Sequence, residues 1–196
     1  MTTQPPAAPP MTGAGAEPAA TRKIRLATIW LDGCSGCHMS LLDIDEAIVA
    51  VAQQADIVYG PLVDAQEVPP DIDVAIVEGA VSSEDDLEKV RKLRRNSRIL
   101  VALGDCAVTG NVPMMRNPLP VKGILERVYV EGADADKGVP TEIVPPLLKQ
   151  AAPLHDVVKV DLHVPGCPPS ARSILFVLKE LLEGRIPDLK SSVRFG

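Results

Sequence analysis

The chain has 196 residues, a formal net charge of −6 and only 3% aromatic residues. An acidic chain with so few aromatic side chains offers neither the basic patch nor the stacking surface that nucleic acids require, so we expect no nucleic-acid partner. No apolar run approaches the roughly 20 residues that span a bilayer, and we expect no membrane segment. The length is that of one ordinary domain with its own hydrophobic core.

Residues 1–21 consist mainly of Pro, Ala, Thr and Gly with a single acidic residue. This composition cannot bury enough apolar surface to order itself, so we expect a disordered leader, followed by a single domain over residues 22–196. The leader has no basic segment before an apolar core and no twin-arginine start, so nothing in it marks export. Because cytosolic thiols stay reduced, four cysteines without an export signal predict metal ligands in a cytoplasmic protein.

Short apolar runs rich in β-branched residues alternate with segments of helical periodicity along the rest of the chain. The predicted strands are residues 24–30, 56–59, 74–77, 98–103 and 157–164. The predicted helices are residues 39–52, a helix capped by Ser82 or Ser83, residues 121–130, a short turn at 146–151 and residues 170–183. We expect residues 107–120 to be irregular. This alternation predicts an α/β fold, namely a flavodoxin-like open parallel sheet with helices on both faces.

All four cysteines follow predicted strands and lie beside glycine; they are Cys34, Cys37, Cys106 and Cys167. Ligands of open α/β sheets bind beyond the carboxyl ends of the strands, where these sulfurs can converge. Four thiolates hold either tetrahedral zinc or a [4Fe–4S] cluster. Structural zinc usually takes two close pairs of ligands in a small module that the metal folds. One pair and two single cysteines on a domain with its own core favour the cluster, with a zinc-binding structural module as the alternative.

Other residues near the cysteines refine this prediction. Gly33, Gly36, Gly104 and Gly166 would let the backbone approach the sulfurs. Of the three histidines only His38 is near the thiols, and we expect it to be a helix-start residue with a polar partner.

A flavodoxin-like fold also suggests FMN, with its phosphate in the loop after the first strand. That loop carries Cys34 and Cys37 where Ser, Thr and Gly donors would be needed. FMN is therefore the less favoured cofactor.

Five ordered motifs resemble those of the small subunit of [NiFe] hydrogenases, and the resemblance spans nearly all of residues 24–184. The motifs are Trp30-Leu31, Cys34-Ser35-Gly36-Cys37, Val77-Glu78-Gly79, Gly104-Asp105-Cys106-Ala107 and Val160-Asp161 leading to Pro165-Gly166-Cys167-Pro168-Pro169. The resemblance implies that the four cysteines ligate the proximal [4Fe–4S] cluster, next to the nickel–iron centre of a large subunit.

Departures from the family pattern narrow the resemblance. The chain lacks a twin-arginine leader and a C-terminal segment with further cysteines, so it is most similar to the small subunit of the cytosolic bidirectional NAD-reducing hydrogenase. Gly33 stands where many members have Glu or Cys, and Asp32 is only its neighbour, so a proton route through that position is not implied. The proximal subunit of respiratory NADH:quinone oxidoreductase is the runner-up, but its first two ligands are adjacent.

The resemblance implies an enzyme subunit without the catalytic centre. A nickel–iron site uses two CxxC pairs, and every thiol of this chain is already assigned. The subunit would pass electrons from the large subunit to an iron–sulfur and flavin-bearing diaphorase that reduces NAD⁺; F420 and ferredoxin are alternative acceptors. Glu78 is predicted either to relay protons or line the interface, or to be a carboxylate bonded to backbone N–H groups. Arg116 and the adjacent Met114 and Met115 are weaker interface candidates.

Overall fold

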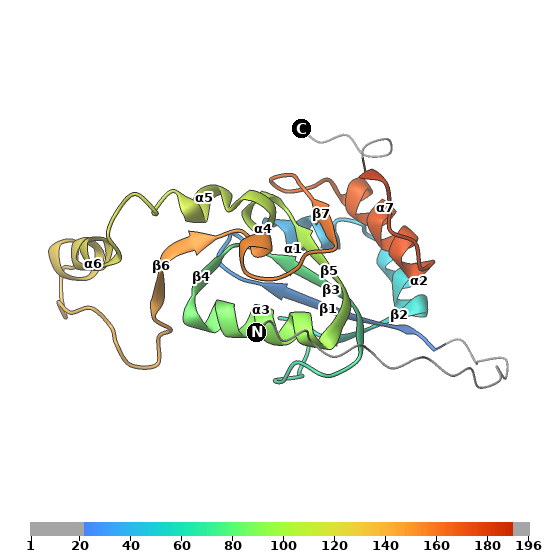
Figure 1. Ribbon diagram of the computed structural model, residues 1–196, viewed down its shortest axis with the longest axis horizontal. Helices are drawn as coiled ribbons and strands as arrows, with labels where there is room; N and C mark the ends of the chain where they lie inside the picture. Colours follow the sequence, from blue (N-terminus) through green and yellow to red (C-terminus); the bar gives the residue numbers. More distant parts are fainter. Residues whose placement is uncertain (1–21, 190–196) are drawn as a thin grey trace, which may run out of the picture.

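The computed structural model describes residues 22–189 (Figure 1), and the predicted disordered leader lies outside the described residues. In chain order the elements are β1 (Ile24–Trp30), α1 (Gly36–Leu42), α2 (Ala47–Gln54), β2 (Ala55–Tyr59), β3 (Ile72–Glu78), β4 (Val81–Ser83), α3 (Glu84–Asn96), β5 (Ser97–Leu103), α4 (Asp105–Thr109), α5 (Asn111–Met114), α6 (Val121–Glu126), the π-helical η1 (Arg127–Glu131), β6 (Leu147–Ala152), the 3₁₀ turn η2 (Leu154–Asp156), β7 (Leu162–Val164) and α7 (Ala171–Leu182).

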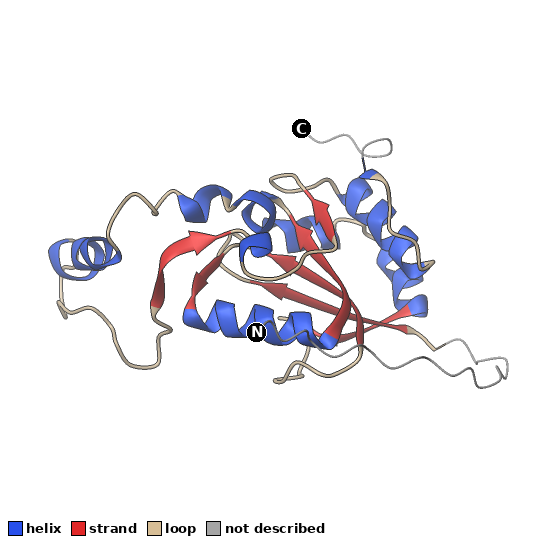
Figure 2. Ribbon diagram, in the orientation of Figure 1, coloured by secondary structure: helices blue, strands red, loops and turns tan. Residues whose placement is uncertain are grey.

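The central sheet has five parallel strands in the order β2-β1-β3-β5-β7 (Figure 2). Counted among themselves, these strands run 2-1-3-4-5, which is the flavodoxin-like order. The predicted fold class is therefore confirmed. The short strands β4 and β6 form a separate antiparallel pair.

Successive residues of the central strands point to opposite faces of the sheet, and each face has its own core. Leu26, Val74 and Val101 pack with α1, α2 and α7, while Ala27, Ala75 and Leu100 pack with α3 and α4. Every residue of β3 is buried. Burial on both faces explains why these strands are continuously apolar in sequence.

The ends of two helices follow the predicted local signals. Ser83 accepts the backbone N–H of Asp86, and the Asp86 carboxylate accepts the backbone N–H of Ser83, so the two residues form a capping box at the start of α3. Ser170 caps α7 in the same way through the N–H of Ser173, and Gly184 follows that helix with a φ of +76°.

Residues 39–52 do not form the single helix that their spacing predicts. α1 ends at Leu42 and α2 begins at Ala47, with Asp45 between them at a φ of +52°. Aspartate tolerates this left-handed conformation better than most residues. A helix break at Asp45 therefore leaves the apolar side chains of both halves on the same core.

Two predictions in the second half of the chain were wrong in detail. Residues 107–120 contain the end of helix α4 and all of α5 and are not irregular throughout, and residues 146–151 form most of strand β6 instead of a helical turn. β6 pairs with β4 through contacts such as Val81 with Ala152. Because this pairing joins residues that are distant in sequence, local periodicity does not reveal it.

The fifth parallel strand is also shorter than predicted and covers only Leu162–Val164. Just before it, the Asp161 carboxylate accepts the Leu100 backbone N–H at 2.9 Å and contacts the Arg94 guanidinium. The side chain of Asp161 thus takes the β5 donor that a longer strand would have used. We infer that this carboxylate sets the start of β7.

We expect Asp161→Asn to lower the free energy of unfolding by about 2 kcal/mol near pH 7, the size typical of a hydrogen-bonded charge. Burial acts to raise the pKa of Asp161, but the Leu100 N–H and Arg94 outweigh it and hold this pKa below the ordinary value of 3.8. The contribution is therefore present above about pH 4 and lost as the pH falls through the lowered pKa. Urea unfolding as a function of pH measures it.

Asp134→Asn is the matched control for this experiment, because Asp134 is exposed. We expect its unfolding curve to follow that of the wild type at every pH. An Asp161 variant that differs from the wild type by the same amount at pH 3 and pH 7 would contradict the electrostatic account.

Along residues 22–189, none of the helices is both long and apolar enough to cross a lipid bilayer.

Candidate metal centre

Three loops at the carboxyl edge of the sheet carry the cysteines, and we call them the cysteine loops. They follow β1 (residues 31–37), β5 (residues 104–106) and β7 (residues 165–169). β1 and β5 both pair with β3, and β7 pairs with β5, all in parallel. Parallel neighbours end at one edge, so the topology brings the three loops to the same side of the sheet.

Hydrogen bonds join the loops after β5 and β7. The Gly104 N–H donates to the Val164 carbonyl at 2.8 Å, and the Asp105 N–H donates to the Gly166 carbonyl at 2.8 Å. In return the Gly166 N–H donates to the Asp105 carboxylate at 2.7 Å. The peptides next to Cys106 and Cys167 are therefore held against each other by three bonds.

The first cysteine loop is attached on both of its sides. The Leu31 N–H donates to the Glu78 carbonyl at 2.8 Å, and Asp32 and Ala80 exchange two backbone bonds. On α1, the Ser40 hydroxyl donates to the Pro169 carbonyl at 2.6 Å. This last bond links the helix that carries Cys37 directly to the loop that carries Cys167.

The four thiols differ in exposure but act on one another. Cys37 is buried, Cys106 is half-buried, and Cys34 and Cys167 are exposed. Burial raises the pKa of the Cys37 thiol to about 12, and the charges of Glu78 and of the other three cysteines add to this effect. The pKa of Cys106 is raised as well, first by burial and then by Cys167 and Cys34. Cys37 thus lies within electrostatic range of the other three cysteines, and Cys106 within range of Cys34 and Cys167.

Glu78 is the most deeply buried acidic side chain near the thiols, with 2% of its surface exposed. Its carboxylate accepts the backbone N–H groups of Cys37 at 3.4 Å and His38 at 2.9 Å. It also lies 2.5 Å from Nδ1 of the His38 ring. The predicted bonds to backbone N–H groups are therefore present, whereas a part in proton transfer or at an interface remains a prediction.

His38 lies in the first turn of α1, and its Glu78 contact supplies the polar partner that the sequence predicts. Its ring also packs edge-on against Trp30, with 5.3 Å between ring centroids. The opposite ring nitrogen, Nε2, is buried and has no hydrogen-bond partner among the described residues. The Trp30 and Glu78 contacts together fix the orientation of the imidazole.

Two glycines at this edge of the sheet, Gly104 in a cysteine loop and Gly79 directly after β3, are required by their conformation and surroundings. Gly104 has a φ of +82°, and a Cβ there would collide with the sulfur of Cys37. Gly79 has a φ of +90°, and its Cβ would lie 2.7 Å from the Leu31 carbonyl carbon. The backbone after β5 therefore lies directly against one thiol, as the sequence predicts for Gly104.

The donor set fits an iron–sulfur cluster. All four donors are thiols, which as thiolates are soft ligands that suit iron–sulfur clusters and zinc. The space beside the Cys37 sulfur is kept clear by Gly104. In residues 22–189, no three His, Cys, Asp or Glu side chains are grouped closely enough to hold a single metal ion.

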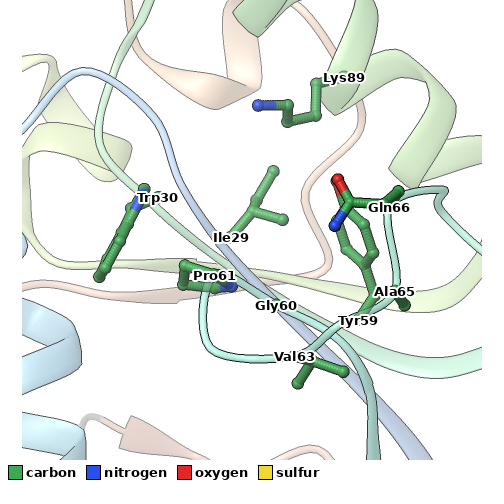
Figure 3. A pocket seen from close by; sticks show the side chains of 9 residues that line it. All are labelled: Ile29, Trp30, Tyr59, Gly60, Pro61, Val63, Ala65, Gln66 and Lys89. Atoms are coloured by element: carbon green, nitrogen blue, oxygen red, sulfur yellow. The ribbon is translucent and has the colours of Figure 1, made fainter.

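A small hollow of about 230 Å³ lies at the ends of β1 and β2 (Figure 3). Trp30, Tyr59 and Lys89 contribute to its walls. In a flavodoxin-like fold this is the region where a flavin would bind. The hollow is smaller than the roughly 300 Å³ at which pockets for drug-sized molecules start. We therefore build no function on FMN here.

Three residues of the site were not predicted as functional from the sequence. Asp105 and Ser40 form the bonds between the loops, and the Asn111 side-chain amide lies 3.5 Å from the Cys167 sulfur. Asp105 is part of the Gly104-Asp105-Cys106 motif, which was the only available signal. The contacts of Ser40 and Asn111 span more than fifty positions and leave no local pattern.

The weaker interface candidates lie beside the loop after β5. Arg116 donates to the carbonyl oxygens of Ser82 at 3.1 Å and Leu148 at 3.0 Å, so it bonds to both β4 and β6. Met115 is 74% exposed, whereas Met114 is half-buried. Only Met115 thus presents a large apolar surface to solvent.

Comparison with known proteins places this fold and site in a family. The family described as NADH ubiquinone oxidoreductase, 20 Kd subunit, matches residues 34–181. The NAD-reducing hydrogenase HoxS subunit delta of Cupriavidus necator is 39% identical over 176 residues, which cover 87% of this chain and 84% of that protein. A chain of the F420-non-reducing hydrogenase of Methanocaldococcus jannaschii is 37% identical over 88% of this chain. The present chain spans 61% of that relative's length.

Solved structures agree with these sequence matches. A chain of an NAD⁺-reducing [NiFe]-hydrogenase in the H₂-reduced state superposes with a TM-score of 0.83 at 40% identity, over 89% of this chain and 100% of that one. A [NiFeSe] hydrogenase from Desulfovibrio vulgaris Hildenborough gives 0.53 at 18% identity over 84% of this chain and 62% of that one, a likeness of fold alone.

These findings define the class of protein: the chain is a homologue of hydrogenase subunits, which are parts of an oxidoreductase. It belongs to the NADH ubiquinone oxidoreductase 20 Kd subunit family and, within that family, is similar to the delta subunit of NAD-reducing hydrogenase. The resemblance inferred from the five sequence motifs is confirmed.

Proposed function

We propose that the chain is the electron-transfer small subunit of a cytoplasmic NAD-reducing [NiFe] hydrogenase and that Cys34, Cys37, Cys106 and Cys167 hold one [4Fe–4S] cluster. The observation that carries the proposal is the placement of every cysteine of the chain on three hydrogen-bonded loops at one edge of the sheet. A bound cluster would supply reversible one-electron transfer.

The residues around the thiols would prepare this site in distinct ways. Asp105 and Ser40 fix the spacing of the loops, while Gly104 leaves room beside the Cys37 sulfur. Glu78 holds the Cys37 and His38 peptides and occupies their N–H groups. Because Cys37 is buried and Cys34 and Cys167 are exposed, electrons would enter or leave on the exposed side.

The partners follow from the same proposal. The chain has no thiols left for a nickel–iron centre, so hydrogen would be activated on a large subunit. A diaphorase with flavin and iron–sulfur centres would take the electrons to NAD⁺. The 39% identity to the NAD-reducing relative, whose length the chain nearly covers, favours NAD⁺ over F420 or ferredoxin as the final acceptor.

The decisive experiment is anaerobic purification of the complex through a tag on this chain, followed by metal and sulfide analysis of the separated subunit. We expect a brown protein with about four iron atoms and four sulfides per chain and an absorbance that bleaches with dithionite. The complex should reduce NAD⁺ under hydrogen. A colourless chain with one zinc ion, or a yellow chain that releases FMN, would overturn the cluster assignment. Reduction of F420 or ferredoxin but not NAD⁺ would overturn the assigned acceptor.

A further inference from the structure

Residues 111–147, which we call the arm, contain no buried residue. In Figure 1 the arm leaves the domain through α5, continues through α6 at the far left and returns to β6. The structure describes sixteen exposed large apolar side chains, and nine of them are in the arm. These nine are Val112, Met115, Leu119, Val128, Tyr129, Val130, Ile143, Val144 and Leu147.

Polar contacts fix the base of the arm, and its distal part has no core of its own. Asn117 exchanges two hydrogen bonds of 2.8 Å with the backbone of Ala151. Arg116 bonds to the backbone of β4 and β6. Beyond this base, η1 exposes Val128 and Tyr129 by 54% and 40%. A segment this apolar that buries nothing in its own chain is typical of a surface that a partner covers.

The tip of the arm has the shape of a docking surface. A hollow of about 410 Å³ lies between α6 and the returning segment, with Leu125, Tyr129, Val139 and Val144 among its walls. Next to it, Ile143 is fully exposed with a φ of +68°. This conformation is unfavourable for a β-branched residue, and it presents the side chain outward.

The arm is continuous with the cysteine loops. It begins at Asn111, whose side-chain amide is 3.5 Å from the Cys167 sulfur. Val112 and Met115, at 62% and 74% exposed, follow at once. A partner seated on the arm therefore also reaches the edge where the two exposed thiols lie.

The relatives indicate which partner this is. They include NAD-reducing, F420-non-reducing and coenzyme F420 hydrogenases, which by name differ in their acceptors and share hydrogenase activity. The matches cover 82–88% of this chain, so they run through the arm. An element present with different acceptors is best explained by a partner common to all of them.

We propose that the arm is the docking element for the hydrogen-activating large subunit. This inference rests on the proposed function and deepens it, because it assigns the partner to a defined surface. The partner surface would be apolar, with a side chain that fills the hollow beside Tyr129.

The test is a double variant, Val128→Glu with Ile143→Glu, in the tagged chain within the complex. Both side chains are exposed, so the fold and the cysteine site should be unaffected. We expect about tenfold or greater loss of co-purified large subunit, the effect of charging the centre of an interface, while the chain keeps its iron and its brown colour. Val49→Glu with Leu62→Glu is the matched control, since these side chains are also well exposed, at 60% and 76%, but lie outside the arm.

A photo-crosslinking residue in place of Ile143 gives a second readout that does not depend on a disruptive variant. We expect its crosslinked product to contain the large subunit. Full retention of the large subunit by the double variant, or crosslinks to the diaphorase or to a second copy of the chain, would overturn the assignment. A different result separates the two proposals. If the wild-type chain contained no iron and the double variant still lost the large subunit, the proposed function would be refuted and the docking assignment would stand.

Discussion

Replacing Cys106 by alanine is expected to abolish hydrogen-driven NAD⁺ reduction by the assembled complex. Cys106 is the only thiol on the loop after β5, and Gly104 and Asp105 hold that loop against the end of β7 and the loop that carries Cys167. Removing one of four thiolates would leave an iron without a protein ligand, and the chain should lose its cluster or bind an unstable one. The measurements are NAD⁺ reduction under hydrogen, and iron and sulfide content per chain.

Thr109→Ala is the control on the same helix, because Thr109 is exposed and bonds only to the Asp105 carbonyl. It should retain iron and activity. A Cys106→Ala complex with unchanged iron content and unchanged activity would show that the Cys106 thiol is not a ligand of the cluster.

Gly104→Ala should be almost as damaging although it removes no ligand. Gly104 adopts φ 82° and ψ 163°, a region that is essentially restricted to glycine and costs other residues on the order of 1–3 kcal/mol. The added methyl group would also collide with the Cys37 sulfur and lie 3.4 Å from the Gly166 carbonyl oxygen. We expect lower thermal stability and loss of most of the iron, as measured by thermal unfolding and metal analysis.

Gly138→Ala tests whether loss of any glycine has this effect. A Cβ at Gly138 has nothing within 4 Å. We therefore expect this variant to match the wild type in iron content and melting temperature. If Gly104→Ala also matched the wild type, the close approach of the backbone to Cys37 would have no role in the site.

Much of the fold was predictable because its signals are local. The predicted strand at residues 24–30 matches β1, and the helix at 170–183 differs from α7 by one residue at each end. A strand buried on both faces must be apolar throughout, and a helix start needs a capping side chain such as Ser170. Both requirements concern residues that are close together in the sequence, so the sequence alone reveals them.

The errors lie where distant residues decide the local structure. Strand β7 starts only after Asp161, and not at residue 157 as predicted, because the Asp161 carboxylate takes a backbone donor of β5. Strand β6 exists because β4, some sixty-five residues earlier, pairs with it. Neither partner is visible in a window of a few residues.

The candidate site also has a part that the sequence predicts and a part that it does not. Its four thiols were proposed from the sequence, because each cysteine follows a strand and lies beside glycine, and they stay a prediction. The bonds that position them were not predicted, since Ser40 reaches Pro169 and Glu78 reaches Cys37 and His38 across the fold. A hydrogen bond between loops depends on how the strands are ordered, and that order has no signature in either loop.

For this protein the sequence by itself determined the fold class, the four thiols and the likeness to a hydrogenase subunit, because strand periodicity and cysteine spacing are properties of the chain. Only the tertiary structure decided that Glu78 is a buried partner of His38 and that the arm exposes its apolar residues. Burial and exposure are properties of the packed molecule. The sequence alone does not distinguish an apolar residue in a core from one on an exposed surface.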